Sequence, residues 1–350
     1  MPSRQARLIL PALLALSLAA CAQASSSSAP ASAPAPAGAS PSVRPTTSTS
    51  TTPAPYAGAD AVIEVAAGPR GVAHAAGSIW VASTIGNVVQ RVDPLSTQVT
   101  DEIRLDRPVT LVTVGDELWV SVLNADPAGD DQVVRIDTQA NEVASAVDVP
   151  VFHNIAAGAG AIWAADGLGE LRRVDRASGD ATSAGSVGAM TIGIAANDTA
   201  VWGIRDDGAL WRLPVGGGPL QEAPLGVSVP GRSRVGVAPG GGGSVWVAVP
   251  GTVLALETED LTVLTELALP GLELVNDLWV TDTDVWLSAN VTDADLGLDG
   301  GAVLRLDPLT AEVTATFPLG PESSGVVVAD GAVWAVDQRD NVLARFPLVE

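Results

Sequence analysis

The chain repeats a short apolar run centred on a tryptophan, and the first copy is Ser78-Ile79-Trp80-Val81-Ala82. From one copy to the next, the tryptophan steps are 39, 44, 39, 44, 40 and 48 residues. The anchors of the seven copies are Trp80, Trp119, Trp163, Trp202, Trp246, Trp286 and Trp334. A period near ~40 residues, carried by short β-branched runs, is typical of a β-propeller or a solenoid.

Each repeat predicts four short strands. In the first repeat we expect them over residues 71–76, 79–82, 88–92 and 98–105. The third and fourth strands are joined at Asp93-Pro94, a tight-turn signal in which proline fixes φ and the aspartate side chain bonds back to the backbone. A similar aspartate stands at Asp137, Asp175 and Asp307. Many inner strands are continuous apolar runs, which indicates sheets packed on both faces, as propeller blades are.

The two ends of the repeat region complement each other. The last repeat supplies strands at 325–329, 332–336 and 342–346 and then lacks its outermost one. The segment Ala61-Val62-Ile63-Glu64-Val65 has the missing type and precedes the first repeat. An open ring would leave exposed strand edges. We therefore predict an all-β, seven-bladed propeller over residues 58–350, with four-stranded blades, closed by this N-terminal strand on the last blade; six or eight blades fit the repeat count less well.

Residues 1–21 have the pattern of an export signal. Arg4 and Arg7 precede an apolar core over residues 8–20, which is too short to span a membrane. The segment ends Leu18-Ala19-Ala20-Cys21 and resembles the bacterial lipobox, in which the cysteine is diacylated. Two acyl chains suffice for stable anchoring, so we expect attachment to the membrane at Cys21. The alternative is an ordinary signal peptide in which the cysteine is incidental.

Residues 22–57 are almost entirely alanine, serine, threonine and proline. Such a segment has little to bury, so we expect a disordered tether between the anchor and the propeller. The expected location of the folded part is the extracytoplasmic face of the cell membrane.

Charge argues against two classes of partner. The chain has 40 acidic and 18 basic residues, a net charge of −22. Such a surface repels phosphates, so we expect no nucleic acid and no direct binding to anionic lipid headgroups. Solubility of an exported monomer is sufficient to explain the acidity. With one cysteine, the chain has no disulfide framework.

The repeat has a family resemblance. The first repeat resembles the YVTN-type propeller repeat, a family that overlaps with the virginiamycin B lyase-like propellers. The resemblance is carried by Gly68-Pro69-Arg70-Gly71-Val72-Ala73, Ser78–Ala82 and Val89-Gln90-Arg91-Val92-Asp93-Pro94. The resemblance implies a propeller over roughly residues 60–350. It also implies that a relative can be a metal-dependent lyase, with a histidine and carboxylates around magnesium in the later blades. Here the two histidines are His74 and His153, in blades one and three, so that pattern is not matched.

A ligand site is expected where the inner strands begin, around the central channel. In five of the seven repeats, polar side chains that could ring the channel mouth stand about ten residues before the tryptophan or beside that position; the second and fourth repeats have Val109 and Ile192 there. The polar residues are Arg70, His153, Asn154, Arg232, Arg234, Asn276, Asp277 and Glu322. Several arginines converging on one axis would suit a carboxylate, a phosphate or a sugar acid. The alternative is that all are solvated loop residues.

A calcium site is the second candidate. Asp293, Asp295 and Asp299 are spaced through a loop between a second and a third strand, and carboxylate oxygens are calcium ligands. The spacing departs from the EF-hand pattern, so a solvated acidic loop is the alternative. For His74, in an inner strand, we expect a buried imidazole bonded to a backbone carbonyl, and for the tryptophans we expect core packing.

Taken together, these features predict a lipid-anchored protein whose propeller binds a small molecule or a protein. The alternative function is a metal-dependent lyase or hydrolase that uses the same face.

Overall fold

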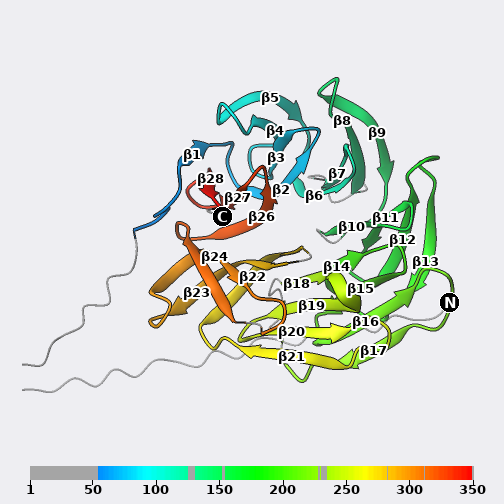
Figure 1. The fold of residues 1–350 in the computed structure, drawn as a ribbon. Coiled ribbons are helices and arrows are strands. Elements are labelled where there is room, and N and C mark those ends of the chain that lie inside the picture. The colour runs from blue at the N-terminus through cyan, green and yellow to red at the C-terminus, as the bar shows by residue number, and fades with distance from the viewer. Residues whose placement is uncertain are drawn as a thin grey trace, which may run out of the picture. The chain divides into compact units, whose positions relative to one another are not determined.

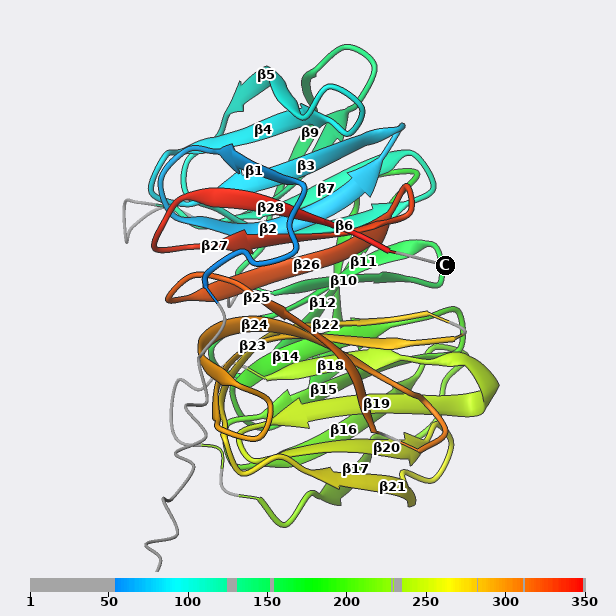
Figure 2. The ribbon, with the colours of Figure 1, turned by 60° about the vertical axis from the view of Figure 1, so that its left-hand side comes forward.

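The computed structural model describes residues 54–348 apart from 125–130, 152–153, 228, 230–234, 282 and 311. In this part the chain forms seven four-stranded antiparallel sheets. The sheets follow one another as blades around a ring, as Figure 1 shows face-on and Figure 2 from another side. The predicted signal segment with Cys21 lies outside the described residues, and so does the predicted tether as far as residue 53.

The first four blades each take four consecutive strands, ordered from the ring centre outward. Blade 1 has β2 (Pro69–Ala75), β3 (Ser78–Ser83), β4 (Val88–Asp93) and β5 (Gln98–Arg104). Blade 2 has β6 (Pro108–Val114), β7 (Glu117–Val122), β8 (Gln132–Asp137) and β9 (Glu142–Asp148). Blade 3 has β10 (Ile155–Gly158), β11 (Ala161–Ala165), β12 (Glu170–Asp175) and β13 (Ala181–Ser186). Blade 4 has β14 (Thr191–Ala196), β15 (Ala200–Arg205), β16 (Ala209–Pro214) and β17 (Gln221–Pro224).

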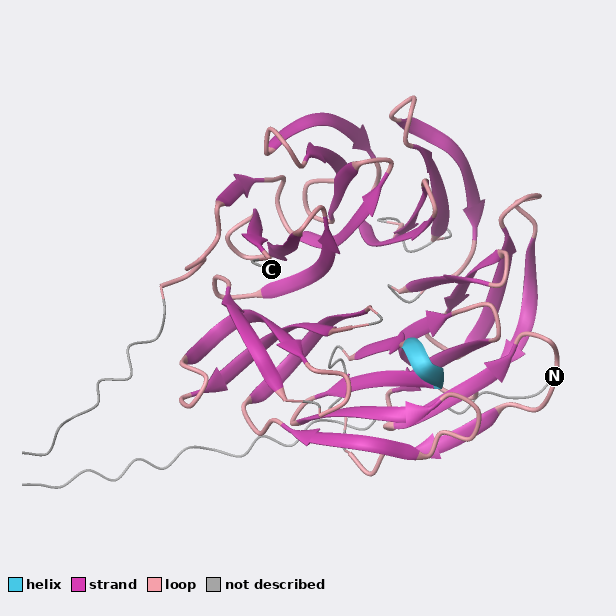
Figure 3. Ribbon diagram, viewed as in Figure 1, coloured by secondary structure: helices cyan, strands magenta, loops and turns pink. Residues whose placement is uncertain are grey.

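The later blades carry the variations. Blade 5 has β18 (Gly236–Pro239), β19 (Ser244–Val249), β20 (Thr252–Glu257) and β21 (Val263–Ala268), with the 3-10 turn η1 (Gly241–Gly243) after its first strand. This turn is the helical element of the described chain (Figure 3). Blade 6 has β22 (Leu272–Val280), β23 (Val285–Asp293), β24 (Leu298–Leu306) and β25 (Val313–Pro318). Blade 7 has β26 (Ser323–Ala329), β27 (Ala332–Asp337) and β28 (Val342–Pro347), with β1 (Ala61–Glu64) as its outer strand.

The predicted pairing of the N-terminal strand with the last repeat is present. In β1, Val62 lies opposite Ala344 and Glu64 lies opposite Val342 of β28, in antiparallel register. The Tyr56 hydroxyl donates a hydrogen bond to Oδ2 of Asp340 at 2.8 Å, which ties the segment before β1 to the same blade. The outer edge of β28 is thereby covered by a strand from the opposite end of the repeat region.

The repeated tryptophans form the core, as the sequence predicts. All seven lie on the second strand of a blade and are at most 3% exposed. In six blades the residue opposite the tryptophan, on the third strand, is an arginine, a pairing that was not among the predictions from the sequence. The pairs are Trp80 with Arg91, Trp119 with Arg135, Trp163 with Arg173, Trp202 with Arg212, Trp286 with Arg305, and Trp334 with Arg345. In the first, sixth and seventh blades the guanidinium carbon lies 5.3–5.5 Å from the ring centroid, a cation–π contact.

The aspartate turns also have the predicted geometry. Oδ1 of Asp93 accepts a hydrogen bond from the backbone N–H of Leu95 at 2.9 Å, and Oδ1 of Asp307 accepts one from Leu309 at 2.7 Å. The bond from Leu95, together with one from the Ser96 hydroxyl, holds the pKa of Asp93 below its usual range. A side chain that satisfies the turn backbone in this way explains the return of aspartate at the same place in several repeats.

Glycines let the innermost strands approach one another closely. A Cβ on Gly325 of β26 would lie 2.8 Å from the Arg70 carbonyl oxygen and 2.9 Å from the Val72 nitrogen of β2. A Cβ on Gly71 of β2 would lie 2.6 Å from the Val109 carbonyl oxygen of β6. Since real Cβ atoms do not come this close to backbone, these positions require glycine. The close approach sets the diameter of the ring around its central channel.

Candidate ligand-binding cavity on the propeller axis

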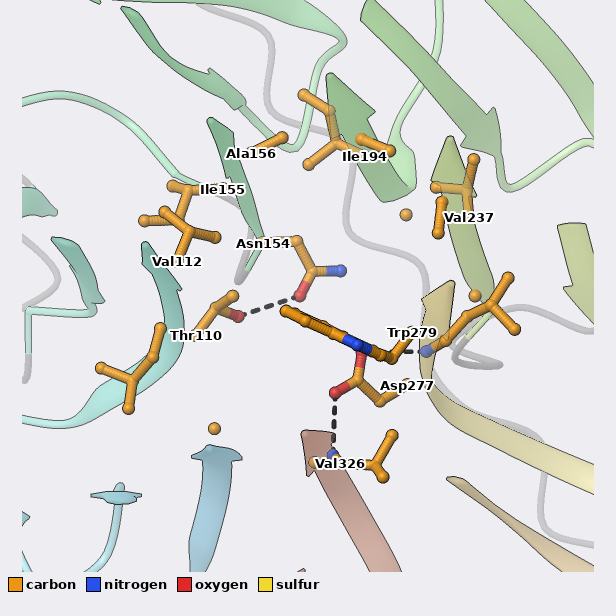
Figure 4. Close-up of a pocket in the computed structure, with 18 of the residues that line it drawn as sticks. Thr110, Val112, Asn154, Ile155, Ala156, Ile194, Val237, Asp277, Trp279 and Val326 are labelled. Atoms are coloured by element: carbon orange, nitrogen blue, oxygen red, sulfur yellow. Dashed lines mark hydrogen bonds between the residues drawn. The ribbon is translucent and has the colours of Figure 1, made fainter. Parts of the chain in front are cut away.

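A cavity of about 770 Å³ lies on the axis of the ring, within the size range of small-molecule sites. The innermost strands of all seven blades line it. Most of its wall is aliphatic. Representative wall residues are Val72, Leu111, Ile155, Ile194, Val237 and Val326. Its polar wall residues are few, and Figure 4 shows some of them projecting inward from several blades.

Arg70 lies in β2, one residue from the start of this strand, and lines the cavity as predicted. Its guanidinium makes no hydrogen bond and no salt bridge with any residue of the described chain. Burial lowers its pKa, the charge of Glu322 opposes that effect, and the charge of Arg107 adds to it. A partly buried guanidinium without a hydrogen-bond partner retains its full capacity to bind an anion.

Asn154 also lines the cavity, but it is held by neighbouring strands. Its Oδ1 accepts a hydrogen bond from the Thr110 hydroxyl at 3.2 Å, as drawn in Figure 4. Its Nδ2 donates to the Ile192 carbonyl oxygen at 3.1 Å. These contacts join three successive blades at the channel wall and fix the amide for a polar contact with a ligand.

Asn276 lines the cavity as well, yet it lies in the interior of β22 and not at its start. The expected strand start was wrong by four residues because β22 and β23 extend together beyond the other inner hairpins. Nδ2 of Asn276 donates to Oδ1 of Asn290 and to Oγ of Ser323, both at 3.3 Å. This side chain connects the sixth and seventh blades.

Apart from Asp277, four further predicted mouth residues divide into two groups. Glu322 precedes β26 and acts on Arg70 through its charge. His153, Arg232 and Arg234 lie outside the described residues, so their proposed ligand role stays a prediction. Arg107, which also acts on Arg70 electrostatically, was missed because nothing in its local sequence distinguishes it from a surface arginine.

Asp277 is the acidic residue of the cavity wall. Its Oδ2 accepts a hydrogen bond from the backbone N–H of Val326 at 3.0 Å, and its Oδ1 accepts one from Leu278 at 2.9 Å. The carboxyl keeps partial contact with the channel but lies deep in the ring, and this burial raises its pKa to about 6. At neutral pH it therefore supplies a negative charge inside a cavity lined mostly by aliphatic residues.

Trp279 departs from the expectation that every tryptophan packs in the core. Its side chain lines the cavity, and the residue is 38% exposed. In Figure 4 its ring projects into the cavity beside Asp277. The expectation was wrong because the apolar run around Trp279 looks like any other inner strand, whereas this side chain points toward the channel and not between blades.

His74 also differs from the expectation. It lies in β2, but its side chain is one-third exposed, and its Nε2 is 3.4 Å from Oδ2 of Asp330. The partner is thus a carboxylate of the last blade and not a backbone carbonyl. This pair lies outside the lining of the axial cavity.

The predicted calcium loop is a tight extension of a β-hairpin. Oδ1 of Asp293 accepts hydrogen bonds from the backbone N–H groups of Asp295 at 2.9 Å and Leu296 at 3.1 Å. Asp299 already belongs to β24, where it pairs with Thr292. Among the described residues, no three acidic, histidine or cysteine side chains gather closely enough to hold a metal. Calcium binding here stays a prediction.

Comparison with known proteins supports the architecture. No protein-family model and no curated protein sequence matches the chain. A chain in the crystal structure of a mitotic checkpoint complex is similar, with a TM-score of 0.67 and 10% sequence identity. The match covers 85% of this chain and 96% of that one. At this identity the likeness shows the seven-bladed propeller fold alone, and a fold shared with many chains does not specify an activity.

Proposed function

We propose that the propeller is a binding module that takes a small ligand into its axial cavity. The observation that carries the proposal is Arg70, a partly buried guanidinium that lines the cavity with no hydrogen-bonding partner among the described residues. A buried charge without a partner is costly unless a ligand supplies one. The ligand is expected to place an anionic group at this side chain and an apolar body against the aliphatic wall.

Isothermal titration of the full chain with hydrocinnamate tests this proposal, because that probe joins one carboxylate to an apolar ring. We expect wild type to bind it and Arg70→Gln to bind it at least about tenfold more weakly, since a charge-assisted contact is lost. Arg104→Gln is the matched control, because Arg104 is 76% exposed and does not line the cavity. Absence of binding to wild type, or equal losses in both variants, would overturn the proposal.

We also propose the cellular setting that the sequence indicates. Residues 1–21 act as a lipoprotein signal, Cys21 carries the lipid, and residues 22–57 tether a monomeric propeller (58–350) at the extracytoplasmic face of the membrane. Among described residues, no helix is both long and apolar enough to cross a membrane. Assignment to the YVTN-type or virginiamycin B lyase-like propellers belongs to the same proposal and rests on the repeat motif.

Protein binding is the second candidate function. Two large apolar side chains, Ile85 at 70% exposure and Leu168 at 81%, lie in loops between second and third strands, on the side where the inner strands begin. The similar chain in a mitotic checkpoint complex belongs to a protein assembly. A photo-crosslinking residue at position 168 should then give a discrete adduct in cells. Position 95 is the control, because Leu95 is 93% exposed in a turn at the opposite side.

The alternative of a metal-dependent lyase or hydrolase would need a cation near the channel mouth. Its test is a thermal melt of the full chain with and without magnesium, compared with the same melt for His153→Ala. A magnesium-dependent stabilisation that this substitution removes would favour the enzyme over the binding module.

A further inference from the structure

Trp279 is exceptional among the tryptophans of this chain. The seven repeat tryptophans are at most 3% exposed, whereas Trp279 is 38% exposed and lines the axial cavity. An aromatic ring left uncovered inside a channel loses the stabilisation that burial would give it. The face of an indole is also the strongest aromatic partner for an organic cation. The exposed ring therefore offers a surface to a ligand and adds little to the core.

Asp277 lies two residues before Trp279 on the same strand, so both side chains are on the same face of β22. The register between Val275 and Asp277 shifts at a β-bulge, a device that re-aims side chains. Figure 4 shows both side chains directed into the cavity. Strand alternation thus places a carboxylate and an open aromatic ring on one wall, and the bulge lies directly before this pair.

Two hydrogen bonds orient the Asp277 carboxylate but leave some of its acceptor positions unused. Each oxygen accepts one backbone hydrogen bond, from Leu278 at 2.9 Å and from Val326 at 3.0 Å. A carboxylate has about four acceptor positions, so about two remain for a ligand. No salt bridge within 4.0 Å engages Asp277 in the described structure. It is a fixed anion in a mainly aliphatic cavity.

Two side chains supply the charge on the described part of the cavity wall. Among described lining residues, only Arg70 and Asp277 are charged, and they come from blades 1 and 6. A purely anionic ligand would leave Asp277 without a counterion, and a purely cationic one would do the same to Arg70. The wall is therefore complementary to a molecule that carries one group of each sign on an apolar body.

We propose that Asp277 and Trp279 form a subsite for an ammonium group, so that the ligand of the axial cavity is an amine-bearing, apolar molecule with an additional anionic group. This inference rests on the proposed function and specifies the ligand class of the same cavity. The carboxylate of Asp277 forms an ion pair with the ammonium group. The indole face of Trp279 packs against the same cationic end of the ligand, including the carbon atoms next to the nitrogen. Burial raises the pKa of Asp277 to about 6, and a bound ammonium group would favour its ionised form.

The experiment compares two probes of nearly equal size, phenethylamine and phenethyl alcohol, by titration of the full chain. Wild type is expected to bind the amine at least about tenfold more tightly than the alcohol. Asp277→Asn should abolish this preference, and Trp279→Leu should reduce it about three- to tenfold, because leucine keeps apolar contact without a π face. Asp295→Asn is the control, since Asp295 lies in the same blade away from the cavity.

Two results would overturn the subsite: equal affinity of wild type for the two probes, or unchanged amine preference in both cavity variants. If hydrocinnamate binding still depends on Arg70 in that case, the axial cavity binds ligands and only the ammonium subsite is wrong. If wild type binds none of the probes, cavity binding itself fails. Thermal melts check that each variant is folded. If Asp277→Asn does not fold, Trp279→Leu still tests the subsite.

Discussion

Oδ2 of Asp277 in blade 6 accepts a hydrogen bond from the backbone N–H of Val326 in blade 7 at 3.0 Å. The two residues are 49 positions apart, so this bond joins neighbouring blades at the channel wall. It also places an acidic group where desolvation opposes ionisation, which raises its pKa from 3.8 to about 6.

The raised pKa predicts a pH-dependent stability. Because folded Asp277 holds its proton more tightly than the unfolded chain does, its contribution should become more favourable as pH falls from about 6 toward 4, by at most about 3 kcal/mol. Urea unfolding of wild type and Asp277→Asn at several pH values measures this. The wild-type minus variant difference in free energy of unfolding should rise on acidification. A difference that stays constant between pH ~7 and ~4.5 would contradict the assignment.

The seventh and first blades provide a packing prediction. Gly325→Ala places a Cβ 2.8 Å from the Arg70 carbonyl oxygen, and this backbone atom cannot move without moving β2. We expect a loss of about 1–3 kcal/mol in the free energy of unfolding. Gly216→Ala is the control, since no atom lies within 4 Å of the added Cβ and the change should stay within about 0.5 kcal/mol. Equal effects would mean that the ring relaxes at the β26–β2 contact.

Much of this architecture could be predicted from the sequence because its signals are local. The tryptophan period places the second strands, the aspartate turns place the third and fourth, and Ala61–Val65 supplies the missing outer strand. Each signal acts over a few residues, and the first two return in several blades. The arginines opposite the tryptophans follow the same period and were detectable in principle, since each falls about ten to twenty residues after its tryptophan.

The site was less predictable because it depends on contacts between blades and on side-chain direction. Arg70 and Asn154 could be placed at the channel because they stand near the starts of inner strands. Trp279 could not: it stands outside the tryptophan period, but so does Trp211, which is buried, and the register shift in β22 has no signal in the sequence. The burial of Asp277 likewise depends on its contact with Val326 of β26; the repeat period places β26 beside β22 but does not specify that contact.

The N-terminal strand predicts an asymmetry between two deletions. Removing residues 58–67 takes away β1, uncovers the edge of β28, and should lower the melting temperature of the propeller. Removing residues 25–50 should leave it nearly unchanged, because a segment rich in alanine, serine and proline has little to bury. Thermal melts monitored by circular dichroism compare the two. Equal shifts would show that β1 adds nothing to the stability of the last blade.

Anchoring is tested at Cys21. Cys21→Ser should abolish lipid attachment, because serine offers no thiol for diacylation, and the protein should appear in the medium or stay unprocessed. Metabolic labelling with a fatty acid, followed by membrane fractionation, measures the outcome. A variant that is cleaved normally and remains bound to the membrane would refute the lipobox assignment.

The calcium prediction is best examined at Asp295. Its backbone N–H, and not its carboxylate, bonds to Oδ1 of Asp293, so Asp295→Ala removes one candidate ligand and leaves the turn intact. If calcium binds the folded state alone, a hundredfold excess over Kd should stabilise wild type by about 2.7 kcal/mol, a shift of about 2–4 °C in Tm. The alanine variant should lose most of that shift. A wild-type melt that is the same in calcium and in chelator would leave the three aspartates as solvated residues of a hairpin whose turn Asp293 already satisfies.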